Sequence, residues 1–462
     1  MLDVVYSKIV DEIIRVIKSP GDISMAKDLE KIAKARGIKY FLVSWVDLFG
    51  VLRAKLVPAR AIKDMQKNGA GFAGFAAWLD MTPAHPDLFG MPDPDSLIQL
   101  PWNPEIGWVA SDLWMDGKEV EASPRVALKR QLARAAKKGF RMKTGVECEY
   151  HLITADGTKL ADTADTQTKP CYDQQALMRQ YPVIGQICDA MLELGWNPYQ
   201  NDHEDANGQF EMNWDYDDAL KTADKHVFFK YMVRTIAENN GMRATFMPKP
   251  FSHLTGNGCH AHVSIWDKTG KKNLFATNKK DPRGLGLSPL AYQFLGGIMH
   301  SAHDLAAIFN PTVNSYKRIN APRTLSGATW SPNAVTYGGN NRTHMVRVPE
   351  AGRFELRLMD GAVNPYLLQA SILAAGLDGV ENNRDPGDPL DINMYEEAHK
   401  VKNAKKLPSN LLDALRQLDN NKIIRAGLGD ELIDAYVKLK MNDWNSYAAH
   451  LSDWERDNTL DC

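Results

Sequence analysis

The spacing of hydrophobic residues changes along the chain and predicts different elements in different segments. In residues 4–18 aliphatic side chains recur every four positions, which predicts an amphipathic helix. Residues 25–36 predict a second helix, and residues 40–54 predict a β-hairpin with an acidic tip. We therefore expect a helical extension over residues 1–24, followed by a small N-terminal domain built on strands.

A glycine-rich segment at residues 69–74 matches the GxGxxG pattern of dinucleotide-binding loops. Such a loop follows a strand and opens a helix, whereas residues 61–68 before it predict a helix. We therefore interpret the segment as a flexible glycine loop. Residues 83–104, which are rich in proline and aspartate, predict a long connection.

A second, larger domain is predicted to begin near Glu121. Ser123 and Pro124 provide a helix start before a helical period over residues 126–138. Beyond this helix, strands and helices mix without regular βαβ alternation, which favours a mainly antiparallel α+β domain. The last predicted helices cover residues 411–418, 432–440 and 444–454. The predicted domains are residues 1–24, 25–120 and 121–462.

The composition narrows the classes of partner and compartment. The 462 residues are 44 % hydrophobic, and 55 basic against 57 acidic residues give a formal net charge of −2. This balance gives no reason to expect nucleic acid or an acidic membrane as partner. Five cysteines without CxxC spacing favour reduced thiols, and the charges near the N-terminus argue against a signal peptide or a membrane span there. We expect a cytoplasmic protein.

An acidic hairpin around Asn207 and Gly208 is the first candidate for chemistry. Asn-Gly predicts a two-residue turn, and that register places Glu204 directly opposite Glu211. Opposed like charges destabilise a sheet, so we expect a divalent cation between the two carboxylates. The alternative is an exposed acidic hairpin whose charge is solvated by water.

Three further segments place polar side chains at every second position, and hence on one face of a strand. Each pattern alone is typical of a solvated or structural strand. Together with the hairpin they offer five carboxylates and two imidazoles, a ligand set that suits Mg²⁺ or Mn²⁺ better than Zn²⁺. Five glutamates exceed the needs of one ion, so we expect two or more metal positions. The residues are Glu147, Glu149 and His151; His260, His262 and Ser264; and Arg353, Glu355 and Arg357.

Several arginines near these segments indicate phosphoryl transfer. Metal ions neutralise phosphate oxygens, and guanidinium groups bind them with two hydrogen bonds. A salt bridge to one of the same glutamates is the alternative for each arginine. From the residues alone, a metal-dependent phosphohydrolase is the best interpretation. The arginines are Arg318, Arg342, Arg347, Arg353 and Arg357.

From about residue 47 to residue 454 the sequence resembles the glutamine synthetases. The motifs are a Glu-x-Glu strand at 147–149, a Glu-x-x-x-Gly-Gln-x-Glu hairpin at 204–211 and a Gly-x-His-x-His-x-Ser segment at 258–264. Further matches lie at 247–250, 310–318, 341–342, 355–357 and 364–367. The resemblance implies a small N-terminal β-grasp domain and a large catalytic domain with a curved, mainly antiparallel sheet.

The resemblance also implies two metal positions with different ligands. The ligands of one position would be Glu149, Glu204 and Glu211. The ligands of the other, between the ATP phosphates, would be Glu147, His260 and Glu355.

Substrate-binding roles follow from the same resemblance. The residues that would hold L-glutamate are Arg318, Arg357 and Gly256. Those that would contact ATP are Arg342, Arg347, Arg353, His262 and Ser264, with Arg342 stabilising the transferring phosphoryl group. Asp47 would bind the amine across a subunit interface, in a dodecamer of two stacked hexameric rings.

The implied activity is ATP-dependent ligation of a small amine to the γ-carboxylate of L-glutamate. That carboxylate is a poor electrophile because it is an anion. Phosphorylation converts it into γ-glutamyl phosphate, whose carbonyl an amine can attack with release of phosphate. Both steps pass through highly anionic states, which two metal ions and several arginines would stabilise.

The loop after Arg318 departs from the family pattern. Ordinary glutamine synthetases carry a glutamate there that closes the site and helps to take a proton from ammonium, and Thr324 holds its place here. This loop and residues 169–173 resemble the type III or GlnT-like branch, which includes γ-glutamylmethylamide synthetases. We therefore favour methylamine over ammonia as acceptor.

Three alternatives remain open at this stage. They are ordinary glutamine synthesis, ligation to a polyamine, and an inactive homologue with a structural or sensing role. Tyr395 occupies the position of a regulatory tyrosine in some relatives, but so short a match predicts no regulation.

Overall fold

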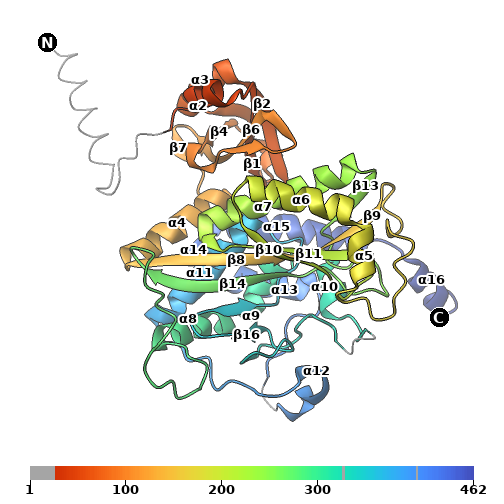
Figure 1. The fold of residues 1–462 in the computed structure, drawn as a ribbon. Coiled ribbons are helices and arrows are strands. Elements are labelled where there is room, and N and C mark those ends of the chain that lie inside the picture. The colour runs from red at the N-terminus through yellow and green to blue at the C-terminus, as the bar shows by residue number, and fades with distance from the viewer. Residues whose placement is uncertain (1–26, 325–327, 402–403) are drawn as a thin grey trace.

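The computed structural model describes residues 27–324, 328–401 and 404–462 (Figure 1). The helix predicted over residues 4–18 lies outside the described residues. Helix α2 (Leu29–Arg36) lies within the second predicted helix and confirms it. The Asp28 side chain caps its first turn, and Gly37 ends it in the left-handed conformation.

A seven-stranded sheet forms the N-terminal β domain. Its hydrogen-bonded order is β2-β1-β6-β4-β3, with β5 and β7 paired to β6. The predicted hairpin is confirmed as the antiparallel pair β1 and β2, while β1 and β6 run parallel. The strands are β1 (Tyr40–Val46), β2 (Leu52–Pro58), β3 (Ala70–Ala73), β4 (Asp87–Pro92), β5 (Ile98–Leu100), β6 (Asn103–Met115) and β7 (Lys118–Glu119).

Two predictions for this domain are wrong. The expected long connection at residues 83–104 contains β4 and β5, both paired with the long strand β6. Its prolines lie at strand ends or outside strands, where a missing amide is tolerated. The expected flexible glycine loop contains β3, which pairs with β4. Helix α3 (Ile62–Asn68) does precede it, so the dinucleotide-binding context is absent as predicted.

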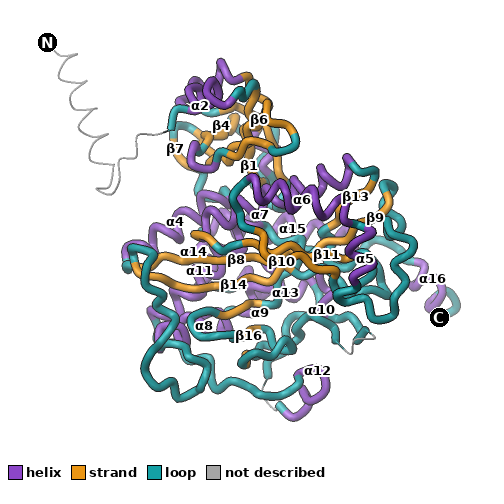
Figure 2. Tube along the Cα trace, viewed as in Figure 1, coloured by secondary structure: helices purple, strands orange, loops and turns teal. Residues whose placement is uncertain are grey.

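Two sheets form the core of the larger domain (Figure 2). The four-stranded sheet has the order β10-β11-β9-β13 and the six-stranded sheet β12-β8-β14-β17-β16-β15. Only β15 and β16 pair in parallel among the described strands of these sheets, which confirms the mainly antiparallel α+β class. The strands are β8 (Phe140–Cys148), β9 (Tyr150–Thr154), β10 (Pro198–His203), β11 (Gln209–Trp214), β12 (Asp217–Asp218), β13 (Met242–Thr245), β14 (Cys259–Asp267), β15 (Tyr337–Gly338), β16 (Val346–Arg347) and β17 (Phe354–Leu356).

Helices α4 (Pro124–Lys137) and α7 (Ala219–Asn239) pack against β8, and α11 (Pro365–Glu381) packs against both helices. These helices cover one face of the six-stranded sheet and leave the other face for polar side chains. The other helices of this domain are α5 (Gln174–Arg179), α6 (Tyr181–Glu193), α8 (Pro289–His300), α9 (Ala302–Phe309), α10 (Ser315–Ile319), α12 (Met394–Glu397), α13 (Leu411–Asn420), α14 (Lys422–Leu428), α15 (Asp430–Ala448) and α16 (Asp453–Thr459). The helix predicted over residues 444–454 is wrong in its bounds, because α15 runs through Ala448 and α16 begins at Asp453.

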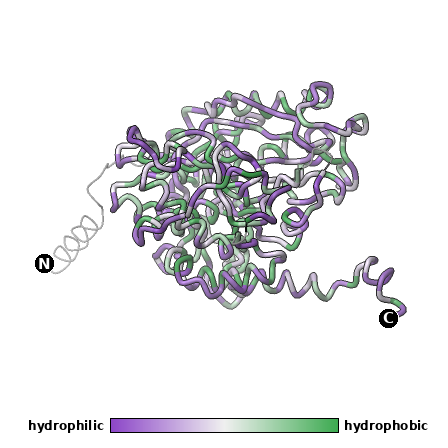
Figure 3. The backbone as a smooth tube through the Cα atoms, turned by 90° about the horizontal axis from the view of Figure 1, so that it is seen from below, coloured by the Kyte–Doolittle hydropathy of each residue, from purple (hydrophilic) through white to green (hydrophobic). Residues whose placement is uncertain are grey.

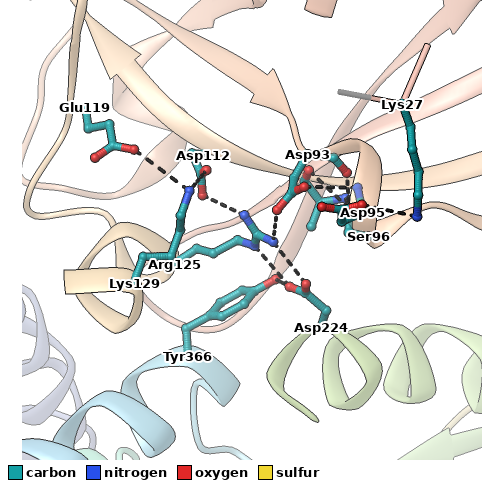
Figure 4. A network of polar contacts seen from close by, with 11 residues as sticks. Lys27, Asp93, Asp95, Ser96, Asp112, Glu119, Arg125, Lys129, Asp224 and Tyr366 are labelled. Carbon is teal, nitrogen blue, oxygen red and sulfur yellow. Dashed lines mark hydrogen bonds and ion pairs between the residues drawn. The ribbon is translucent and has the colours of Figure 1, made fainter. Parts of the chain in front are cut away.

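A buried arginine joins the two domains (Figure 4). Arg125, 3 % exposed, donates to Asp112 of β6 at 2.7 Å and to Asp93 at 2.7 Å. It also donates to Asp224 of α7 at 3.0 Å, which accepts a further hydrogen bond from Tyr366 of α11. Because a buried charge without partners is costly, this network favours a fixed arrangement of the N-terminal sheet on the catalytic helices.

Hydrophobic and hydrophilic positions interleave along the backbone (Figure 3). Among the described residues, no helix is both long enough and apolar enough to cross a membrane. The C-terminal segment with α16 extends away from the rest of the chain (Figures 1 and 3). Its large apolar side chains are exposed, with Trp454 at 69 % and Leu460 at 78 %.

Candidate active site

The acidic hairpin is present, but its predicted register is wrong by two residues. Asp202, rather than Glu204, lies opposite Glu211. The turn is longer than two residues, because the last strand pair is His203 with Phe210. Gly208 has φ 68° but Asn207 does not adopt positive φ, so the two-residue turn predicted for Asn-Gly is absent. The distant Asp165 carboxylate accepts hydrogen bonds from the Gly208 amide at 2.6 Å and from the Asn207 side chain at 2.8 Å. A two-residue shift keeps the same side chains on the same face of the hairpin.

The hairpin forms one wall of a cavity of about 680 Å³. All five predicted glutamates line this cavity, together with two of the three histidines, the serine and four of the five arginines. These residues are Glu147, Glu149, Glu204, Glu211, Glu355, His260, His262, Ser264, Arg342, Arg347, Arg353 and Arg357. The third histidine, His151, is buried outside the cavity, with Nδ1 2.8 Å from Asn257 Oδ1. The strands that carry most of them alternate polar residues with buried apolar ones, as their sequence pattern predicted.

One group of carboxylates lies at the hairpin, and we call Asp202, Glu204 and Glu211 the hairpin carboxylates. One oxygen from each lies within 4.8 Å of the others. Burial, and then the nearby Glu149 charge, raise the pKa of Glu204 to about 8. Burial and the charge of Glu147 raise the pKa of Glu211 well above its ordinary value. These carboxylates therefore lack sufficient positive charge from the chain itself.

A second group lies on β8, β14 and β17, and we call Glu147 and Glu355 the paired carboxylates. His262 Nε2 lies 2.6 Å from Glu147, and His260 Nδ1 lies 3.3 Å from Glu147 and 3.6 Å from Glu355. Burial would raise the pKa of Glu147, but the two histidines outweigh it and hold that pKa well below its ordinary value. The residues predicted for the second metal position thus lie near one another, and their binding of a metal ion stays a prediction.

Two arginines complete the second group. Arg357 donates to Glu355, and Arg347 Nη1 donates to the other oxygen of the same carboxylate at 2.8 Å. Burial would raise the pKa of Glu355, but Arg357 and then His260 lower it to about 2. Both arginines therefore form the salt bridges to a glutamate that the alternative interpretation expected. Both also line the cavity.

Arg353 lies between His262 and Glu350. It donates to His262 Nδ1 and to Glu350 at 2.7 Å. Because His262 also contacts Glu147, a chain of polar contacts connects Arg353 to the paired carboxylates. The sequence patterns did not single out Glu350. Asp202 lies two residues before Glu204 and so on the same face of the hairpin, but it was not counted among the candidate ligands.

Arg318 and Gly256 lie beside the cavity wall rather than among its lining residues. Arg318 is 3 % exposed and donates to the Leu358 carbonyl at 3.1 Å. A Cβ atom on Gly258 would lie 2.8 Å from Arg318 and 3.2 Å from Glu149, so this glycine lets both side chains approach. At Gly256 a Cβ atom would lie 2.1 Å from the Pro248 carbonyl oxygen, so the close approach of the backbone there requires glycine.

Asp47 lies outside the cavity and is 0 % exposed. Its carboxylate accepts hydrogen bonds from the Phe49 amide at 3.0 Å, the Val51 amide at 2.9 Å and Arg53 at 3.0 Å. These bonds close the turn between β1 and β2. Within one subunit Asp47 therefore has a structural role, and its predicted contact with an amine across a subunit interface stays a prediction.

The donor atoms of the cavity fit divalent cations. His260 Nε2 is buried and has no hydrogen-bond partner among the described residues, and the hairpin carboxylates lack compensating charge. Carboxylate oxygens with one or two imidazoles suit hard divalent ions. Glu149 differs from the other glutamates, because it accepts from the Gly258 amide at 2.6 Å and from Gln209 at 2.9 Å.

Clustered carboxylates and arginines around one cavity define a site for metal-dependent phosphoryl transfer. The model of the glutamine synthetase catalytic domain matches residues 121–459. The chain belongs to the glutamine synthetase family and is an ATP-dependent glutamate ligase. Members of this family act on glutamate, ATP and ammonia or an amine, and generally use divalent metal ions.

Similar proteins carry two different names. The chain is 65 % identical to a glutamine synthetase of Rhizobium leguminosarum bv. phaseoli, over 95 % of this chain and 100 % of that protein. It is 43 % identical to a glutamate–methylamine ligase of Methyloversatilis universalis, over 94 % of this chain and 99 % of that protein. A solved GmaS/ADP complex is 62 % identical, with a TM-score of 0.91, over 94 % of this chain and 100 % of that chain.

Proposed function

We propose that this enzyme ligates methylamine to the γ-carboxylate of L-glutamate and forms N5-methylglutamine. The observation that carries the proposal is the contact of Thr324 with the hairpin. Thr324 Oγ1 lies 3.2 Å from Asp205 Oδ2, an oxygen that also accepts from Thr255 at 2.8 Å. The loop thus meets the hairpin through a short neutral side chain, which favours an amine that carries a methyl group. Similarity to the glutamate–methylamine ligase and to GmaS supports this acceptor.

Residues in the cavity wall and directly beside it would bind and orient the other substrates. Arg342, Arg347 and Arg353 would hold the ATP phosphates by charge-assisted hydrogen bonds, with His262 and Ser264 nearer the nucleotide. Arg318 and Arg357, beside Gly256, would hold the carboxylates of glutamate. Mg²⁺ ions bound by the glutamates and His260 would neutralise charge on the phosphate oxygens when present.

The proposed assembly is a dodecamer of two hexameric rings in the cytoplasm, with active sites between subunits. The exposed apolar side chains of the projecting segment around α16 support self-association, since such surfaces mark protein contacts. Sedimentation velocity of the intact protein tests the stoichiometry. A monomer at micromolar concentration would contradict it.

The test of the acceptor is phosphate release from ATP with Mg²⁺ and L-glutamate, across ammonium, methylamine, ethylamine and putrescine. We expect the highest kcat/KM with methylamine. Thr324→Glu should shift the preference toward ammonium by about tenfold, because one added charge near the site contributes about 1 kcal/mol or more. Thr324→Gln is the matched neutral control. Highest kcat/KM with ammonium in the wild type would favour ordinary glutamine synthesis, the second candidate, which the similarity to the Rhizobium enzyme supports.

A further inference from the structure

Cys148 and Cys259 face each other across strands β8 and β14. Both are 0 % exposed and lie on the face of the sheet that is covered by helix α7, away from the candidate active site. The Glu149 amide donates to the Gly258 carbonyl, whereas the Cys259 amide donates toward Met359. The cysteines therefore form a non-hydrogen-bonded pair, in which Cα atoms are about 4.5 Å apart and side chains are closest.

This geometry fits a covalent bond between the two sulfurs. Disulfides join residues whose Cα atoms are about 4.4–6.8 Å apart. The two sulfur atoms and a nitrogen of His226 all lie within 4.8 Å of one another. We propose that Cys148 and Cys259 form a reversible disulfide that makes the ligase sensitive to oxidation.

The same three donors could hold a soft metal ion, but the charges around them argue against it. His226, Lys230 and Arg234 are spaced four residues apart and so lie along one face of α7. Lys230 is buried and donates to the Gly361 carbonyl at 2.7 Å, while Arg234 lies over the Phe246 ring. A bound cation would face these two positive groups in a poorly solvated environment, whereas a disulfide is neutral.

The oxidant must be small because both thiols are buried. Hydrogen peroxide satisfies this condition. One thiol is oxidised to a sulfenic acid while peroxide yields one water, and the second sulfur then displaces the hydroxyl group as a second water. In total, two S–H bonds and the O–O bond break, the S–S bond forms, and two electrons pass from sulfur to oxygen. His226 Nε2, 3.7 Å from Cys259 Sγ, is placed to transfer the proton.

The disulfide would act on the active site through the strands. The pair next to the cysteines is Glu147 opposite His260, whose side chains point to the other face of the same strands. A bond between the sulfurs restricts the movement of β8 and β14 relative to each other, and so constrains the distance between these two residues. Oxidation should therefore lower the ligase rate, and reduction should restore it.

The test uses the full-length enzyme with Cys171, Cys188 and Cys462 changed to serine. After treatment with hydrogen peroxide, the protein is unfolded, alkylated and digested for mass spectrometry. We expect a peptide pair linked through Cys148 and Cys259, together with loss of activity that dithiothreitol reverses. The link should also form in the wild-type enzyme, so the result does not depend on the folding of a variant.

The matched control is Cys148→Ser in the same background. It removes one sulfur with a small change in volume and should abolish both the link and the reversible loss of activity. Full alkylation of both cysteines after peroxide treatment would overturn the proposal. So would one tightly bound zinc or copper ion per chain that is lost in the Cys148→Ser variant.

Discussion

The hairpin carboxylates and the paired carboxylates line the same cavity, yet their surroundings shift their pKa values in opposite directions. At the hairpin, burial and neighbouring carboxylates raise the pKa of Glu204 to about 8. On β17, Arg357 and His260 overcome the effect of burial and lower the pKa of Glu355 to about 2. The first group is short of positive charge, and the second group is supplied with it by the fold.

The hairpin carboxylates therefore need a bound cation to balance their charge, whereas the paired carboxylates are already balanced by side chains of the protein. A buried carboxylate without a partner is destabilised in its ionised form, whereas a buried ion pair is costly to break. We therefore expect the hairpin to depend on divalent ions and the β17 region to stay ordered without them. Matched Glu-to-Gln substitutions in the two groups measure this contrast.

Glu204→Gln should give the largest effect on activity. It removes one charged ligand while it keeps the size of the side chain, and we expect kcat/KM to fall by about 10³-fold, in line with loss of one electrostatic contact at a reacting centre. The metal-free variant should nevertheless melt at a higher temperature than the wild type at a pH above about 8, where Glu204 is ionised. Steady-state kinetics measures the fall in kcat/KM, and calorimetry measures the rise in the melting temperature of the metal-free protein. Unchanged turnover with unchanged metal dependence would contradict the hairpin as a metal position.

Glu355→Gln should have the opposite effect on stability. It leaves Arg357 and Arg347 without their shared carboxylate, and breaking a buried pair typically costs about 3–5 kcal/mol. Denaturant unfolding of the metal-free protein measures this loss. If Glu355→Gln and Glu204→Gln shifted stability in the same direction, the contrast between the two groups would be wrong.

The stability of the metal-free protein should vary with pH according to the ionisation of Glu204 in the hairpin. The folded-state pKa of Glu204 is raised from 4.5 to about 8, so its contribution is fully present below about pH 4.5 and is lost as the pH rises through about 8. Mg²⁺ at about 100 times its dissociation constant should restore about 2.7 kcal/mol. The rise in melting temperature with Mg²⁺ should be larger near pH 9 than near pH 6, where protons compete with the metal ion. An equal rise at both pH values would contradict this account.

The alternation of polar and apolar residues was sufficient to locate most of the active-site wall. Each polar side chain at every second position points to the same face, so the residues of β14 and β17 could be assigned from sequence. Register could not be assigned, because a shift of two residues keeps the face unchanged. The turn was set by Asp165, which lies some forty residues before it in the chain, and no local pattern contains that contact.

The strands of the N-terminal domain show a second limit of local patterns. β4 and β5 carry prolines near their ends, and their pairing with β6 determines their conformation. Propensity is a weak guide where tertiary pairing satisfies the backbone. The family resemblance supplied the class of enzyme, while the contacts of Asp47 and Arg318 became visible only in the structure.

Substitution of Asp47 should have the smallest effect, and it tests directly whether the contacts in the structure or the family resemblance describes the role of this residue. Its carboxylate accepts three hydrogen bonds within the turn between β1 and β2, so Asp47→Ala should destabilise the protein by about 1–3 kcal/mol, the cost of leaving buried donors unsatisfied. Asp47→Asn keeps one acceptor oxygen for the two amides and should recover much of this loss. If Asp47 instead bound the amine, both variants would raise the KM for methylamine while the melting temperature stayed the same. Measuring the melting temperature and the amine KM on both variants therefore distinguishes a turn-closing carboxylate from a substrate-binding one.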